Sequence, residues 1–348
     1  MNEQAILLGV PKVEFSGDGI TPFARCLKAC ANYLGMDTGY DYVMAASGAA
    51  FRLTWDTTKW EGGNVDVSFT FDDPSKIYRL GIESLGCEQN LLNRTEETKK
   101  SDFVSFIKTK IDAGYPCIAL GIIGPPEACI ITGYRNGGNI LLGWNFFQDN
   151  PEFAAGVTFD ESGYFITDKW WENPCTMAVM SLGEVTKEKF TPKMVLQNAI
   201  EVMTGRDVQN VAKGLSAYDA WAEAVLNDAN FPQNAILAIL AERLMVHGDA
   251  MDCLADGRYN ASKYMQNLIS SYPVHKEMLE EAANLFIQVC GIFGKMNNIL
   301  GGWQRGENEM RMFAKPQVRE QIAKIIYEAK NADAKALEII KELVSSRI

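Results

Sequence analysis

The sequence predicts a chain of two halves, an α+β domain at residues 1–185 followed by an all-helical domain at residues 190–348. Before about residue 185, short apolar runs of strand character alternate with turns. Beyond the polar segment SLGEVTKEKFTP, apolar residues recur instead with the 3.6-residue period of an amphipathic helix. The chain has 348 residues, which is enough to bury a core in each half.

The first half contains two predicted helices among its strands. The segment TPFARCLKACANYLG has Thr21 as its expected N-cap, Pro22 at the first helical position and Gly35 as a stop. The segment SDFVSFIKTKIDAG predicts a second helix with Ser101 as its cap. Five later runs have strand character: CIALGII, ACIITGYR, NILLGWNFF, GYFITD and TMAVMSL. A helix near the start with strands clustered after the second helix indicates an α+β domain.

The second half predicts about six or seven helices packed as a bundle. Residues 234–254, 275–293, 316–330 and 332–346 all place apolar side chains on one helical face. His247 and Asp249 point in different directions on a helix, so we interpret them as a helix end at Gly248 or an exposed turn rather than as metal ligands. His275 is expected to begin the helix that continues to residue 290.

Charge and composition exclude several classes of protein. The formal net charge of −11 gives a field that repels phosphate backbones and anionic lipids, so we expect neither a nucleic acid nor a membrane as partner. The first residues have no basic region or small-residue cleavage site, and no apolar run reaches the length of a membrane span. The expected location is the cytoplasm.

The cysteine pattern indicates reduced, buried thiols rather than a metal module. Eight cysteines are scattered along the chain, most of them within apolar runs, and there is no C-x-x-C motif. The two histidines lie far from the main group of cysteines in the sequence. We therefore expect no metal site, and none of the motifs implies a cofactor.

Three stretches of the first half carry a resemblance to a known family. They are the early helix CLKACANYLG, the small-residue stretch SGAAFRLTW, and the strand pair EACIITGYRNGGNILLGW. Over roughly residues 5–180 the chain resembles the N-terminal domain of butirosin biosynthesis protein H and, more distantly, the C39 bacteriocin-processing peptidases. The helical second half is similar to the general plan of the butirosin-type proteins. The resemblance implies a papain-like fold for the first half.

The same resemblance implies a degenerate catalytic site. In the relatives a cysteine opens the early helix and a histidine opens the later strand, where the two side chains pair. The cysteine position falls here at Thr21 or Pro22, and the histidine position falls at Glu127. The position of the third member, an Asp or Asn in the relatives, falls near Trp144 or Asn145.

These substitutions leave several functions open. The leading hypothesis is a papain-like domain without the nucleophile–base pair that binds a small amine- or peptide-like ligand in the old cleft. The alternative is a cysteine-dependent acyltransferase or amide hydrolase in which Cys26 forms a thioester and Asn145 helps to hold the oxyanion. A third possibility is a scaffold whose helical half mediates assembly.

The candidate residues have structural interpretations as well. Cys26 and Cys30 share a helix face, as core residues would. Glu127 either anchors the start of the early helix, accepting hydrogen bonds from its free N–H groups, or recognises a ligand's amine. Aromatic residues in strands more often belong to the core than to a binding site. The residues expected to line a ligand groove are Thr21, Phe51, Arg52, Trp55 and Trp144.

Overall fold

The chain divides into two compact units, each made of two separate segments. The computed structural model describes residues 2–15, 19–61, 66–346 and 348. The first unit comprises Met1–Val43 and Tyr78–Lys189, and the second comprises Met44–Ile77 and Phe190–Ile348. The mixed α+β character and the helical C-terminal half that the sequence predicts are both present.

The segment Met44–Ile77 is where this division differs from the expected one, which assigned residues 1–185 to a single domain. Within the second unit, strand β2 (Thr54–Asp56) of this segment pairs with strand β10 (Val211–Lys213). Local periodicity carries no information about a partner more than 150 residues away, so the sequence gives no sign of this pairing. The division between Lys189 and Phe190 lies within the expected boundary region.

The first unit is built on one antiparallel sheet. Its strands are β1 (Ala5–Ile6), β3 (Cys87–Asn93), β4 (Cys117–Leu120), β5 (Ala128–Arg135), β6 (Ile140–Trp144), β7 (Thr158–Phe159), β8 (Phe165–Thr167) and β9 (Ala178–Val185). The hydrogen-bonded order is β3-β9-β4-β5-β6-β8-β7, with β1 also paired to β5. All of these pairs are antiparallel. The five runs assigned to strands from the sequence all contribute to this sheet.

Two helices of the first unit match the sequence prediction closely. Helix α1 (Pro22–Tyr33) has Thr21 as N-cap and Pro22 as its first residue, as expected. Helix α4 (Lys100–Asp112) begins earlier than predicted, with Lys99 rather than Ser101 as its cap. The reason is that the Asp102 carboxylate accepts a hydrogen bond from the Lys99 backbone N–H, at 2.8 Å. Helices α2 (Tyr40–Ser47) and α3 (Lys76–Ser84) each contain a boundary between the units.

Both faces of the central strands are covered. Every residue of β4 is buried, as are all but the last of β5, which explains their uninterrupted apolar sequences. Phe103 and Ile107 of α4 pack in one cluster with Cys117 and Cys129. Helix α1 also contacts β4 and β5, but none of its side chains belongs to that cluster, which places α1 against the other face of the sheet.

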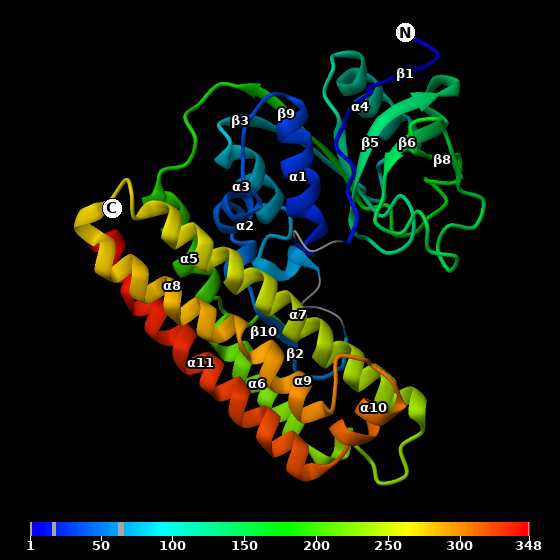
Figure 1. The fold of residues 1–348 in the computed structure, drawn as a ribbon. Helices are drawn as coiled ribbons and strands as arrows, with labels where there is room; N and C mark the ends of the chain where they lie inside the picture. Colours follow the sequence, from blue (N-terminus) through cyan, green and yellow to red (C-terminus); the bar gives the residue numbers. More distant parts are fainter. Residues whose placement is uncertain (1, 16–18, 62–65, 347) are drawn as a thin grey trace. The chain divides into compact units, whose positions relative to one another are not determined.

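The second unit is a helical bundle with a short two-stranded sheet. Its helices are α5 (Pro192–Met203), α6 (Leu215–Leu226), α7 (Leu237–Leu268), α8 (Lys276–Cys290), α9 (Ile292–Leu300), α10 (Glu307–Phe313) and α11 (Pro316–Ser345). Short 3-10 turns lie at Ala49–Phe51, Val67–Thr70, Asp228–Asn230 and Pro273–His275. Helix α8 packs against both α7 and α11, and the three run side by side in Figure 1. Seven helices among the described residues from Pro192 onward confirm the predicted number.

The helix end predicted at Gly248 is wrong. Helix α7 continues through Gly248 to Leu268, and His247 is fully buried in its interior rather than exposed in a turn. A side-chain carbon at Gly248 would lie 2.4 Å from the guanidinium carbon of Arg305. Gly248 leaves room for the guanidinium group of Arg305, which pairs with Asp249 and Asp252 on the same helix, and it does not stop the helix. The predicted start of the next helix at His275 is confirmed, since His275 is the N-cap of α8.

None of the described helices is both long and apolar enough to cross a membrane.

Candidate functional site

Cys26 lies in the interior of the first unit. It is the fifth residue of α1 and so lies beyond the first turn. The helix dipole stabilises a thiolate only within the first turn, so it does little for Cys26. The side chain has no exposed surface. Burial raises the pKa of the Cys26 thiol well above its ordinary value, and the nearby Cys129, Cys30 and Glu127 raise it further. In this environment the thiol is protonated at neutral pH.

Glu127 lies close enough to Cys26 for its charge to act on the thiol. It directly precedes β5, and its backbone is fixed at that point: its carbonyl accepts a hydrogen bond from the Gly121 N–H at 3.1 Å. The side chain is half-buried. The Glu127 carboxylate therefore acts electrostatically on Cys26, another residue that the sequence singled out. Whether the carboxylate accepts hydrogen bonds from the start of α1, next to Thr21, stays a prediction.

Trp144 and Asn145 end strand β6 in well-defined structural positions. The Trp144 indole N–H donates to the Val10 carbonyl at 2.9 Å, and its ring packs edge-on against Tyr164. The Asn145 side-chain oxygen accepts a hydrogen bond from the Phe147 N–H at 2.7 Å, which closes the turn after the strand. Both side chains are buried. These contacts fix the fold around the end of β6.

The thiol that interacts with Asn145 is Cys129, a residue that the sequence reasoning did not select. Burial raises the pKa of Cys129 to about 12, and hydrogen bonds from Asn145 and from the Ile122 and Ala119 backbone act in the opposite direction. Like Cys26, this thiol is fully buried and protonated at neutral pH.

Phe51, Arg52 and Trp55 belong to the second unit, whereas Thr21, Glu127, Trp144 and Asn145 belong to the first. The side chains of Phe51, Arg52 and Trp55 are all buried. The Phe51 ring packs against Phe286, and the Trp55 ring stacks on Trp221. The Arg52 guanidinium donates to the Ala49 carbonyl at 3.0 Å. These contacts hold the three side chains within the core of the second unit.

An open cleft of about 500 Å³ lies in the first unit, next to the turn that leads into β5. Its apolar lining residues are Ile122, Ile123, Pro125, Phe153, Ala155 and Val157. Its polar lining residues, together with Gly124, are Glu152, Thr167, Lys169, Glu172, Asn173 and Cys175. None of the side chains selected from the sequence lines it, but Glu127 lies two residues after Pro125, which belongs to one wall of the cleft.

The walls of this cleft are fixed by a small network of hydrogen bonds. The Asn173 side-chain amide donates to the carbonyls of both Gly121 and Gly124, each at 2.9 Å, and the Thr176 hydroxyl also donates to Gly121. Gly121 has a positive φ, and a side-chain carbon there would lie 1.8 Å from the Cys175 carbonyl oxygen. Only glycine fits at this point. The two walls of the cleft therefore hold each other in place.

Two sequence signals could have indicated the cleft. The segment GIIGPPE separates two buried strands with two glycines and two prolines, and the segment KWWENPC combines aromatic with polar residues between strands. Each segment forms one wall. Their pairing depends on contacts across 52 residues of sequence, which neither segment reveals by itself.

Comparison with models of protein families gives no match for this chain, and comparison with curated protein sequences gives no significant match either. The resemblance to the butirosin-type proteins therefore stays a hypothesis. In the described part of the chain, no three His, Cys, Asp or Glu side chains are grouped so that they could hold a metal ion.

Proposed function

We propose that the first unit is a papain-like domain that has lost its nucleophile–base pair and binds a small amine- or peptide-like ligand. Two features support the papain-like interpretation: helix α1 packs on the central strands of an antiparallel sheet, and the start of β5 brings Glu127 near Cys26. The proposal that the unit no longer catalyses a reaction is based on the burial and protonation of the Cys26 thiol. A buried, protonated thiol is a poor nucleophile, and the neighbouring carboxylate disfavours its ionisation further.

The cleft beside the turn into β5 is the observation that carries the ligand proposal. Its volume of about 500 Å³ is in the range of small-ligand sites. Apolar side chains such as Ile122 and Phe153 would cover the hydrocarbon part of a ligand. The exposed carboxylates of Glu152 and Glu172 would attract an ammonium group, and Lys169 would suit a carbonyl.

Binding of phenethylamine, measured by isothermal titration calorimetry, tests this proposal. N-acetyl-phenethylamine has the same ring but no charge, so we expect it to bind more weakly. Each exposed ion pair contributes up to about 1 kcal/mol, so the double variant Glu152→Gln/Glu172→Gln should lose between a few-fold and about thirtyfold in affinity for the amine. The variant Glu161→Gln changes an exposed carboxylate that does not line the cleft, and it should bind the amine normally.

Equal binding of the amine and its acetyl derivative, unaffected by the double variant, would refute an amine-binding cleft.

The alternative function, acyl transfer through Cys26, makes a different prediction. It requires that a thioester form at Cys26, which an activated acyl donor such as a p-nitrophenyl ester would reveal by a mass increase on the peptide that contains this residue.

A further inference from the structure

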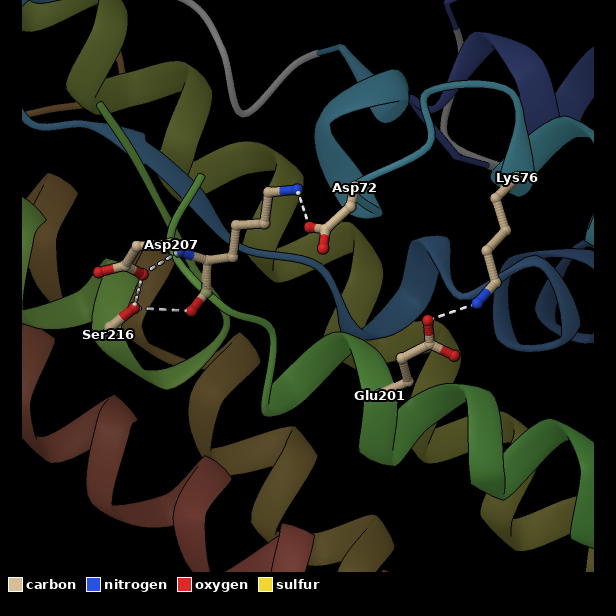
Figure 2. A network of polar contacts seen from close by, with 6 residues as sticks. Asp72, Lys76, Glu201, Asp207 and Ser216 are labelled. Atoms are coloured by element: carbon tan, nitrogen blue, oxygen red, sulfur yellow. Dashed lines mark hydrogen bonds and ion pairs between the residues drawn. The ribbon is translucent and has the colours of Figure 1, made fainter. Parts of the chain in front are cut away.

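A second cavity, of about 470 Å³, lies wholly within the second unit. Its lining is mostly charged, with Lys76, Arg206 and Lys213 as cations and Asp72, Asp73 and Glu201 as anions. Thr70, Phe71, Thr204 and Gly205 complete the lining. The lining comes from residues 70–76, which lead into α3, from the end of α5 and the residues after it, and from Lys213 of strand β10. These three segments are far apart in the sequence, and side chains from each are drawn in Figure 2.

The ammonium group of Lys213 is the most unusual feature of this cavity. The side chain is only 5% exposed, yet its single acceptor among the described residues is Asp72 Oδ1, at 3.1 Å. An ammonium group has three N–H donors, and burying it with so few partners is unfavourable. The partner, Asp72, is 71% exposed and so shields the charge poorly. The site therefore favours an additional acceptor next to Lys213.

The backbone of Lys213 is held firmly in place. Its N–H donates to Asp207 Oδ1 at 3.2 Å, its carbonyl accepts from the Ser216 hydroxyl at 2.9 Å, and Ser216 also donates to Asp207 (Figure 2). Gly214, with positive φ, lies so close to the Met203 carbonyl oxygen that a side-chain carbon there would be 2.3 Å away. These constraints fix the backbone position from which the Lys213 side chain extends into the cavity.

Thr70 provides a second, independent sign of a missing partner. It lines the same cavity, is 4% exposed, and its hydroxyl is buried without a hydrogen-bond partner among the described residues. Buried hydroxyl groups are rarely left unpaired, because each costs free energy. An unpaired hydroxyl and an under-coordinated ammonium in one cavity both call for an acceptor group, such as a carboxylate.

The other charges of the cavity indicate what else the ligand carries. Lys76 is already paired with Glu201 (Figure 2). Its ammonium group also lies 4.7 Å from the centre of the Phe71 ring. Three anionic and three cationic side chains balance each other, so a polyanion such as a phosphate ester would face three carboxylates. A molecule with one carboxylate and one ammonium group would find a partner for each.

We propose that this cavity binds a small zwitterion, an α-amino acid, with its carboxylate on Lys213 and Thr70 and its ammonium group toward the carboxylates of Asp72 and Glu201.

Titration calorimetry of the full chain against the twenty standard L-amino acids, one at a time, tests the proposal. We expect saturable binding of at least one. Acetate and methylamine, which each carry one of the two charges, and inorganic phosphate should bind at least about tenfold more weakly.

Variants then locate the binding site. Lys213→Met keeps the length and burial of the side chain but removes the charge, and should weaken binding of the amino acid by about tenfold or more. Thr70→Val keeps the shape of the side chain, and should weaken binding a few-fold while leaving the fold intact even if Lys213→Met does not. Lys324→Met, which changes an exposed lysine of α11 outside the cavity, serves as the matched control.

The proposal is overturned if no amino acid binds, or if binding survives both Lys213→Met and Thr70→Val. Phosphate that binds as tightly as any amino acid, with loss in Lys213→Met, would also overturn it, because the cavity would then be a simple anion site.

Discussion

Six of the eight cysteine side chains in the described structure are buried, and the other two, Cys175 and Cys290, are half-buried. This is the pattern that their positions within apolar runs predict. Burial raises the pKa of the thiols of Cys26, Cys30 and Cys117 well above the ordinary value. A thiolate, which is the reactive form, is therefore scarce at these positions at neutral pH.

Alkylation by iodoacetamide at neutral pH, mapped by mass spectrometry, should follow this division. In the folded protein we expect modification at Cys175 and more slowly at Cys290, whose pKa is raised by partial burial, and none at Cys26. Unfolding in urea should make all eight thiols reactive. Cys175→Ser is the control that assigns the fast phase. Fast alkylation of Cys26 in the native state would contradict the buried-thiol interpretation and favour the enzyme hypothesis.

Histidine shows what sequence reasoning at the residue scale misses. The sequence places His247 at a helix end, but its ring is stacked on Phe313, and its Nδ1 accepts a hydrogen bond from the Trp221 indole at 3.1 Å. Burial lowers the pKa of His247 to about 3, so the ring is neutral. Both partners belong to other helices, far away in the sequence, and no local pattern around Gly248 reveals them.

Helices and strands with a strong apolar period could be predicted from the sequence. Short elements, and strands that depend on a distant partner, could not. The five predicted strand runs and the helices of the second unit are present. Strand β3, with its mixed polar sequence CEQNLLN, has no clear apolar pattern because it lies at the edge of the sheet with only partial burial. Residues 316–330 and 332–346 have two separate helical patterns in the sequence, and they form the single helix α11.

Helices α7 and α11 are joined by an ion pair that the helical pattern does not predict. Arg258 and Asp333 are each 1% exposed, and the guanidinium donates to the carboxylate with N–O distances between 2.6 and 3.0 Å. The Tyr218 hydroxyl also donates to Asp333, at 2.7 Å. Arg258 reaches further, to the carbonyls of Ala50 and Arg52. Both charges of this pair are therefore satisfied by partners within the second unit.

Removing one member of this pair should be strongly destabilising. Asp333→Ala leaves a buried guanidinium without its counter-charge, which typically costs about 3–5 kcal/mol of the free energy of unfolding. Lys330, on the same helix as Asp333, pairs with Asp219 at a partly exposed position, so Asp219→Ala should cost less than about 1 kcal/mol. Urea unfolding followed by circular dichroism measures both. Similar losses in the two variants would show that burial does not strengthen the first pair.

At the scale of the whole molecule, the order of residues in the chain does not match the division into units. The sequence predicts a boundary between residues 185 and 190 because the period of the apolar pattern changes in this region. It cannot predict that Met44–Ile77 leaves the first unit, because this excursion is defined by long-range contacts within the second. Those contacts are the β2–β10 pair, the Phe51–Phe286 ring contact and the hydrogen bonds from Arg258.

The packing of Met44–Ile77 in the second unit has a consequence that limited proteolysis can measure. Residues 184–189, from the end of β9 into the connection to α5, are exposed, so a protease should cut the native chain there into an N-terminal and a C-terminal fragment. Because Met44–Ile77 stays with the N-terminal fragment but packs in the second unit, the two fragments should elute together in gel filtration and separate only in denaturant. For the same reason, residues 190–348 produced alone should lack a cooperative unfolding transition, since they lose the partner of β10 and the ring that packs on Phe286. Fragments that separate without denaturant, or a C-terminal fragment that unfolds cooperatively by itself, would show that the two halves fold independently and that the segment Met44–Ile77 adds little to the second unit.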